Sequence, residues 1–115
     1  MHPELRAAFE REMRLAREHV QSGRLEEAFS KLERAHVLGQ GYVGAHTSTH
    51  YWMLRVGIRR RDLREIIGQL LRIPTGALGS ALGLVPRGNT GGADVSVLAR
   101  LPIPDDLKRI LDLDS

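Results

Sequence analysis

Apolar side chains recur at steps of three and four residues through the first two thirds of this chain, and isolated glycines interrupt them. This spacing places the apolar residues on one helix face, so the pattern predicts an all-α fold with four main helices. Gly23 and Gly57 close two of the runs. Glycines between residues 39 and 44 separate the second run from the third, and Pro74 limits the fourth. The stripes comprise Leu5, Phe9, Met13, Ala16 and Val20; Leu25, Ala28, Phe29, Leu32 and Ala35; Val43, Met53 and Leu54; and Leu63, Ile66, Ile67, Leu70 and Leu71.

The helices form a weak internal repeat. Gly23 and Gly57 lie 34 residues apart, and each precedes a new helix. Asp62 with Glu65 indicates a capping box at the start of the fourth helix. A 34-residue period of helix–turn–helix units is typical of tetratricopeptide repeats. We therefore expect two stacked antiparallel helical hairpins, tetratricopeptide-like, within a single helical domain spanning residues 1–115, with the C-terminal third covering the apolar face that two such units expose.

The C-terminal third differs in composition from the rest. The segment IPTGALGSALGLVP (73–86) predicts one short buried helix, and Pro104 with Asp105 begins a last short helix. Between them, PRGNTGGADVS (86–96) carries the Asn, Gly and Pro of turns, so this segment is expected to be irregular. The inward residues of the two short helices are Ala77, Leu78, Ala81 and Leu82 in the first, and Leu107, Ile110 and Leu111 in the second.

Composition excludes several classes of protein. The chain has no cysteine, which removes disulfides, thiolate catalysis, zinc fingers and iron–sulfur clusters. The uncharged stretch Ile73–Pro86 is too short to span a bilayer, and the charged N-terminus lacks the apolar core of a signal peptide. We therefore expect a soluble, cytoplasmic protein that does not bind membranes.

One dense basic patch stands out against a small net charge of +3. It comprises Arg55, Arg59, Arg60, Arg61 and Arg64. We interpret this patch as a solvated turn between helices, because a charge run without a base-reading element is rarely a specific nucleic-acid site.

Three of the five histidines occupy positions where the helical period calls for an apolar residue. His36 continues the stripe of the second helix, and His46 and His50 lie four residues apart on one face of the third. In an antiparallel pair joined near Gly39–Gly41, His36 comes out opposite His46. The sequence therefore predicts three imidazoles in one small volume between the second and third helices.

Converging imidazoles are typical of a transition-metal site. Two His at i and i+4 can share one ion, and neutral imidazole suits Zn, Cu, Ni or Fe(II). Glu33, one turn before His36, and Glu12, on the first helix, are candidates for a fourth ligand or for an acceptor of an imidazole N–H. We expect a divalent transition metal, with Zn, Cu and Ni as the candidates.

Other interpretations of the histidines stay open. Backbone carbonyls and the hydroxyls of Thr47, Ser48 and Thr49 could satisfy a buried cluster without metal, as in a helical-repeat adaptor. The histidines could also perform general acid–base chemistry, or form a small metalloenzyme with an open coordination position. No second catalytic constellation accompanies them, so we favour binding over catalysis. A second copy of the chain or another protein is a candidate partner.

Four segments together resemble a bacterial family of unknown function, domain-of-unknown-function family 3703. They are LERAHVLGQ (32–40), the pair His46 and His50, MLRVGIRRRDLREIIGQLLRI (53–73) and PRGNTGGADVS (86–96), and the resemblance extends over roughly residues 5–108. It implies that His36, His46 and His50 are hallmark residues, and it implies an association with heavy-metal resistance and transport. The lack of cysteine argues against mercury or Cu(I) thiolate chemistry, because soft ions prefer sulfur.

The basic patch yields one prediction from sequence alone. Without a base-reading element, phosphate contacts give only weak, salt-dependent affinity, so we expect no sequence-selective retention of DNA or RNA at physiological salt. Filter binding against pools of random DNA and RNA measures this, and enrichment of a defined sequence would contradict it.

Overall fold

The regular structure of the described residues is entirely helical. A computed structural model of the chain describes residues 1–84, 88–93 and 100–114. The helices in these ranges are α1 (Pro3–Gln21), α2 (Leu25–Gly39), α3 (Val43–Arg60), α4 (Leu63–Ala81) and α5 (Asp105–Leu113). The predicted all-α class is confirmed, and so is the short last helix. Of the segment predicted to be irregular, residues 88–93 form neither helix nor strand, and residues 86–87 and 94–96 lie outside the described ranges.

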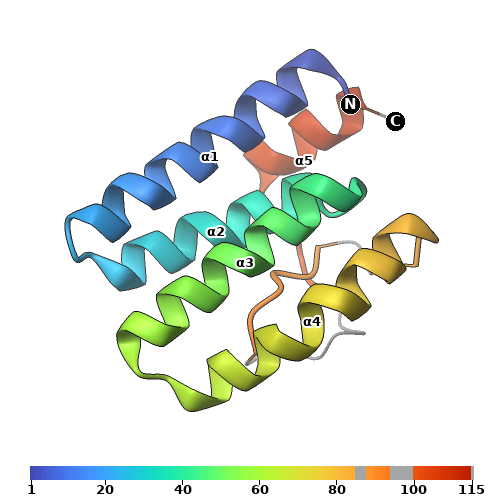
Figure 1. Cartoon of the computed structure of the whole chain (residues 1–115). Coiled ribbons are helices and arrows are strands. Elements are labelled where there is room, and N and C mark those ends of the chain that lie inside the picture. Colours follow the sequence, from blue (N-terminus) through green and yellow to red (C-terminus); the bar gives the residue numbers. More distant parts are fainter. Residues whose placement is uncertain (85–87, 94–99, 115) are drawn as a thin grey trace.

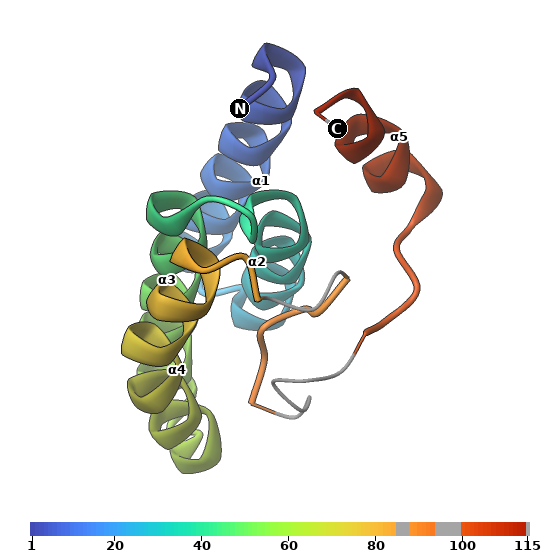
Figure 2. The same ribbon diagram turned by 90° about the vertical axis from the view of Figure 1, so that its right-hand side faces the viewer.

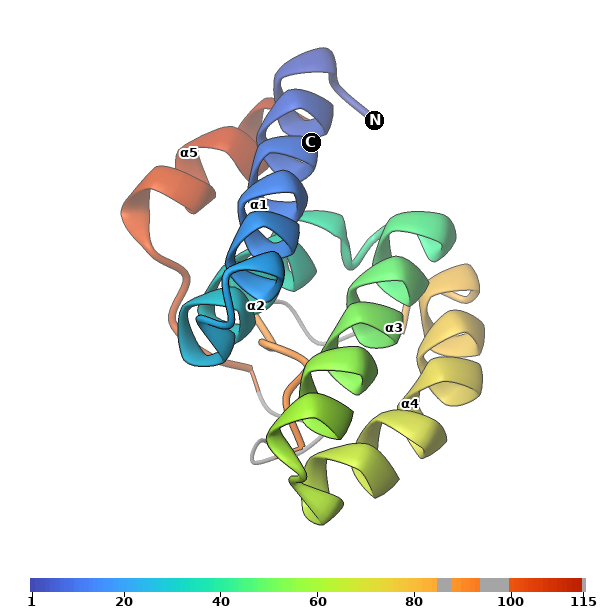
Figure 3. The same ribbon diagram turned by 60° about the vertical axis from the view of Figure 1, so that its left-hand side comes forward.

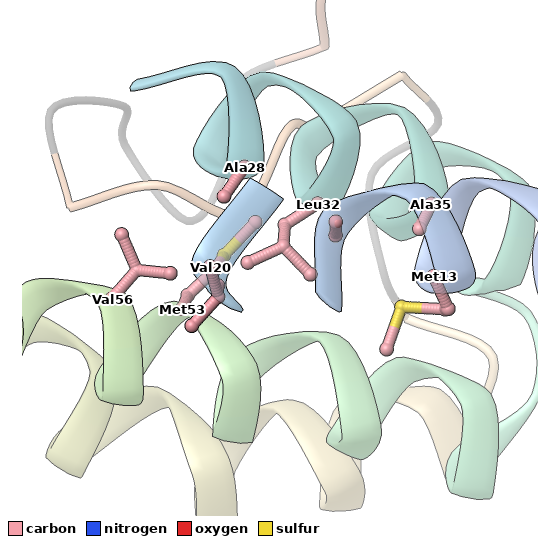
Figure 4. Close-up of a cluster of buried hydrophobic side chains, with 8 residues drawn as sticks. Met13, Val20, Ala28, Leu32, Ala35, Met53 and Val56 are labelled. Carbon is pink, nitrogen blue, oxygen red and sulfur yellow. The ribbon is translucent and has the colours of Figure 1, made fainter. Parts of the chain in front are cut away.

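The first four helices form two stacked hairpins. Helices α1 and α2 pack against each other, α3 and α4 do the same, and the contact between α2 and α3 joins the pairs (Figure 1). At the interface, side chains from α1, α2 and α3 meet in one buried cluster (Figure 4). Its buried members are Met13, Ala16, Val20, Ala28, Leu32, Ala35, Met53 and Val56. The predicted stripes of α1 and α2 therefore supply most of this core. From the predicted stripe of the third helix only Met53 belongs to it, whereas Val43 is 42% exposed.

Helix α5 packs against the start of α1 and the end of α2. Leu107 packs in a second buried cluster with Leu5, Val37 and Leu38. Polar contacts hold α5 there, since the backbone N–H of His2 and the hydroxyl of Tyr42 both donate to the carboxylate of Asp114. Both ends of the described chain consequently lie side by side (Figure 2).

The helix boundaries differ from the prediction at two points. Gly57 was expected to close the third helix, but α3 continues to Arg60 and ends at Arg61, which takes the left-handed conformation with φ 56°. A Cβ atom at Gly57 would lie 3.3 Å from Cγ of Glu65, so this glycine allows α3 and α4 to approach closely. The predicted cap of α4 is present, because Asp62 Oδ1 accepts from the N–H of Glu65 at 3.1 Å.

Pro74 does not end the fourth helix. It lies inside α4, and the short separate helix predicted beyond it is the second half of the same helix. Pro74 is exposed, so water can solvate the Leu70 carbonyl that loses its usual hydrogen-bond partner. Leu78 and Leu82, expected to be buried, are each 62% exposed.

Helix α4 also faces the opposite way from the prediction. Its buried residues are Glu65, Gln69 and Ser80. Of the stripe expected to face the core, Ile66 is half-buried and the other four residues are exposed. Figure 3 shows why: α4 lies at one edge of the helix layer, beyond α3, so only one of its faces meets the rest of the fold. No described helix is both long enough and apolar enough to cross a bilayer.

The basic patch between α3 and α4 makes contacts within the chain. The Arg55 guanidinium lies 4.2 Å from the ring centre of Trp52, Arg60 lies 5.7 Å from that of Phe29, and Arg59 donates to the carbonyl of Val20 at 2.6 Å. Arg59 and Arg60 therefore connect the end of α3 to the first hairpin, whereas the contact of Arg55 lies within α3.

The interface core provides a stability prediction. Leu32 is fully buried between the hairpins, so Leu32→Ala should lower the free energy of unfolding by about 3 kcal/mol. Leu113→Ala is the matched control, because Leu113 is 44% exposed on α5 and should change stability by only about 0.5 kcal/mol. Urea denaturation measures both, and equal effects of the two variants would contradict this assignment of the core.

Candidate metal centre

Three buried histidines meet where the two hairpins join. His36 lies in the last turn of α2, and His46 and His50 lie one turn apart in α3. Their side chains are only 2–3% exposed. The helical periods placed these residues on facing stripes, and the structure brings all three together as predicted.

The Nε2 atoms of the three rings form a nearly equilateral triangle. The distances are 2.9 Å between His36 and His46, 3.0 Å between His46 and His50, and 3.2 Å between His36 and His50. The centre of this triangle lies about 1.8 Å from each nitrogen, so an ion at the usual metal–nitrogen distance of about 2.0–2.1 Å would sit about 1 Å above it. The triangle thus has the size that a shared ion requires.

The opposite ring nitrogens fix the protonation of two rings. His36 Nδ1 lies 2.5 Å from the carbonyl oxygen of Asn89, and His50 Nδ1 lies 2.6 Å from Oε1 of Gln69. Both partners are acceptors, so each Nδ1 carries the proton and donates it. In the neutral rings, Nε2 of His36 and His50 is consequently left with a free lone pair.

This protonation pattern leaves at most one proton for the three contacts among the Nε2 atoms. Two lone pairs facing each other across 3.2 Å repel, and only His46 can offer a proton to the group. His46 Nδ1 is itself buried with no hydrogen-bond partner. Burial lowers the pKa of this ring, and the Gly76 backbone acts in the opposite direction with a smaller effect. A cation among the three Nε2 atoms would attract every lone pair at once.

The orientation of the Gln69 amide is also determined by its neighbours. Its Nε2 donates to Oε1 of Glu65 at 3.2 Å and to the carbonyl of Gly91 at 2.9 Å. With both acceptors on the nitrogen side, Oε1 must face His50. Glu65, a buried carboxylate, also accepts from the N–H of Ala93, so it connects the amide to the C-terminal segment.

Residues 88–93 form a wall against His36. Gly91 has φ 83°, and a Cβ atom there would lie 2.5 Å from Cδ2 of the His36 ring, so both the backbone and the space require glycine. The Asn89 side chain accepts from the N–H of Gly91 at 2.9 Å, which shapes the turn that presents the Asn89 carbonyl. The turn predicted from GNTGG therefore serves as the support of one imidazole.

Helix α4 covers the other two rings with a glycine. A Cβ atom at Gly76 would lie 3.3 Å from Cε1 of His46 and 3.4 Å from Nε2 of His50. A larger residue would therefore intrude on one corner of the nitrogen triangle. The contact with the two imidazoles thus explains why a glycine occupies position 76.

The structure places the two candidate glutamates away from the three rings. Glu12 Oε1 accepts from Arg34 Nε at 3.1 Å, and its Oε2 lies 3.9 Å from Lys31 Nζ. Glu33 lines a surface pocket together with Arg60 and Arg64. Among the described residues, neither glutamate belongs to the group of close metal-ligand atoms, which comprises the three histidines.

Sequence reasoning did not include Asn89, Gln69, Gly91 and Gly76 in the site. Gln69 carried a usable signal, because it is a polar residue one turn after Glu65 in a helix rich in leucine and isoleucine. Asn89 carried none, because it acts through its backbone carbonyl, which every residue has.

Burial keeps the three rings neutral. It is the main cause that lowers the pKa of each, holding that of His50 at about 4 and that of His36 well below the ordinary value of 6.5. Mutual repulsion adds to this for His36, whose pKa the neighbouring rings of His50 and His46 lower further. Neutral imidazole is the form that coordinates metal ions.

A family model described as "Protein of unknown function (DUF3703)" matches residues 3–111, nearly the whole chain. No curated protein and no solved structure matches. The chemistry of the site therefore has to be argued from its own atoms.

The lowered pKa values predict how the metal-free protein responds to acid. Between pH 6.5 and about 4 the histidines of the unfolded chain bind protons, whereas the buried histidines of the folded chain stay neutral. The free energy of unfolding is therefore highest above pH 6.5 and falls as the pH decreases toward 4. For His50 the loss is on the order of 3 kcal/mol. Urea midpoints measured in a chelator across this range test the effect.

Two variants test whether the buried histidines cause this loss of stability in acid. His50→Gln should reduce the pH dependence by the share of His50, while His36 and His46 keep the rest. His19→Gln, on the surface of α1, is the control and should keep the response of the parent. A midpoint that does not move between pH 6.5 and 4 would contradict the assignment.

Proposed function

Because this chain belongs to the DUF3703 family of proteins of unknown function, we propose a function from the site alone: binding of one divalent transition-metal ion by Nε2 of His36, His46 and His50. One observation carries the proposal. Three buried Nε2 atoms lie within 3.2 Å of one another, and the hydrogen bonds of Nδ1 leave free lone pairs on at least two of them.

The donor set favours particular ions. Neutral imidazole suits Zn, Cu(II) and Ni, and a chain without cysteine offers no thiolate to softer ions. A bound ion would supply the positive charge that holds the three lone pairs together. The Asn89 carbonyl and the Gln69 amide would hold the rings in the orientation that coordination needs, as such acceptors do at other histidine sites.

The surroundings favour binding over catalysis. The groups against the rings either orient them, as Asn89 and Gln69 do, or cover them, as Gly76 and Gly91 do. A metalloenzyme would need a positioned base and room for a substrate beside the ion. We therefore assign the protein to metal homeostasis or resistance, as a carrier, sensor or buffer in the bacterial cytoplasm.

The same proposal sets aside the two glutamates and the adaptor alternative. Glu12 and Glu33 stay outside the ligand set, since Glu12 is held by Arg34 and Lys31 and Glu33 lies in a surface pocket. A purely structural cluster would leave the lone pairs of His36 and His50 facing each other in the core with no proton between them. We treat the two hairpins as tetratricopeptide-like units of one domain, with the ion clamping α2 to α3.

Titration of metal-stripped protein tests this function. We expect one equivalent of Zn(II), Cu(II) or Ni(II) to bind and to raise the melting temperature, since ligand at a hundred times its dissociation constant adds about 2.7 kcal/mol. His50→Ala should abolish stoichiometric binding, and Gln69→Leu should weaken it by roughly 10–100-fold. Glu12→Gln is the control and should bind as the parent does.

Two results would refute metal binding. In the first, no ion shifts the melting temperature of the parent protein. In the second, His50→Ala, shown by circular dichroism to be folded, binds as tightly as the parent. Cu(II) electron paramagnetic resonance adds an independent readout, because three imidazole ligands produce nitrogen hyperfine structure that His50→Ala should alter.

A further inference from the structure

The outer face of α4 is a continuous apolar stripe. Its members are Leu63, Ile67, Leu70, Leu71, Leu78 and Leu82, which are between 52% and 68% exposed. They recur at helical spacing over the full length of α4, which spans about 28 Å for its 19 residues. Such a row of large apolar residues in water is unusual for a helix that already belongs to a folded protein.

No charged side chain interrupts this stripe. The charged residues of α4 are Arg64, Glu65 and Arg72. Glu65 is buried, and Arg72 donates inward to the carbonyls of Gly91 and Gly92. Only Arg64, at the first turn, is an exposed charge, so the stripe lacks the charged residues that normally keep a surface helix solvated.

Helix α4 cannot rotate to bury the stripe. Its inner face is engaged by the Gln69 hydrogen bonds and by two glycine contacts. A Cβ atom at Gly68 would lie 2.5 Å from Cβ of Ala93, and one at Gly76 would press on the imidazoles. The outward direction of the stripe is therefore fixed by the inner face.

The size of the stripe fits a protein interface. At half to two thirds exposure each of the six residues presents about 100 Å², so the stripe totals about 600 Å², the upper end for the largest patch on a monomer. A standard interface buries about 800 Å² on each partner. The stripe alone supplies about three quarters of that area.

We propose that a second copy of this chain covers the stripe, so that two α4 helices pack against each other across a twofold axis. An uncharged apolar row is self-complementary, as an interface between identical copies requires. A partner chosen by charge would find nothing to pair with. Helices that lie on membranes carry Lys and Arg along their polar face, whereas the polar face of α4 is used inside the fold.

The mass of the protein in solution tests the pairing, independently of any metal. Sedimentation at micromolar concentration should give twice the 12.8 kDa of one chain. Leu71→Glu should raise the dimer dissociation constant more than about 100-fold, because each interface would bury two unpaired carboxylates. Leu113→Glu on α5 is the matched control and should remain dimeric, and circular dichroism checks that both variants fold.

Cross-linking tests the contact itself. The chain has no cysteine, so a single introduced one gives a clean signal. Leu71 lies midway along the stripe and therefore near the twofold axis, so Leu71→Cys should form an intermolecular disulfide on oxidation, and Leu113→Cys should not.

Three outcomes would overturn the proposal. They are a monomeric parent protein, a Leu71→Glu variant as dimeric as the parent, and a dimer whose Leu71→Cys variant fails to cross-link. A monomer that cosediments with anionic phospholipid vesicles would assign the stripe to a membrane surface instead. None of these results bears on the metal titration, which stands or falls on His50→Ala.

Discussion

Burial of three neutral imidazoles between α2 and α3 is the constraint from which the rest of the structure follows. Each ring brings two nitrogens that need partners, and unpartnered polar groups in a core cost several kcal/mol, on the order of 2–7 for each group. The Asn89 carbonyl and the Gln69 amide meet that need for two rings. Residues 88–93 must therefore pack beside α2, and α4 must turn its polar face inward. The hydrogen bonds of the buried histidines thus determine how α4 and residues 88–93 pack against the stacked hairpins.

The sequence predicted the helices and the meeting of the histidines because both depend on short-range periodicity. The helical period defines one face of each helix, and a connection of only a few residues near Gly41 makes α2 and α3 neighbours. The period does not say what a face meets. The stripe of α4 was expected to be core, yet the opposite face of this helix is the buried one. The helix-breaking tendency of proline predicts a boundary at Pro74, but the position is exposed and the helix continues through it.

The support of the rings was beyond sequence reasoning for a different reason. A backbone carbonyl such as that of Asn89 leaves no mark in the sequence, and only Gly91 hints that the chain passes close to something there. Glu12 shows the converse. Its place on the first helix, beside the second, is compatible with a metal ligand. Its carboxylate instead pairs with Lys31 and Arg34, which lie one turn apart on α2.

The contacts that build the site span very different lengths of chain. His36 and His50, two of the proposed ligands, are 14 residues apart, a short loop with a small closure entropy, so the pairing of α2 with α3 is enough to bring these rings together. The Asn89 carbonyl reaches His36 across 53 residues and arrives only after the C-terminal segment has docked. Until then nothing dictates which nitrogen of His36 holds its proton. The contact that gathers the rings and the contact that sets the proton of His36 therefore depend on different parts of the chain, and loss of the Asn89 contact would free the tautomer of His36 without separating α2 from α3.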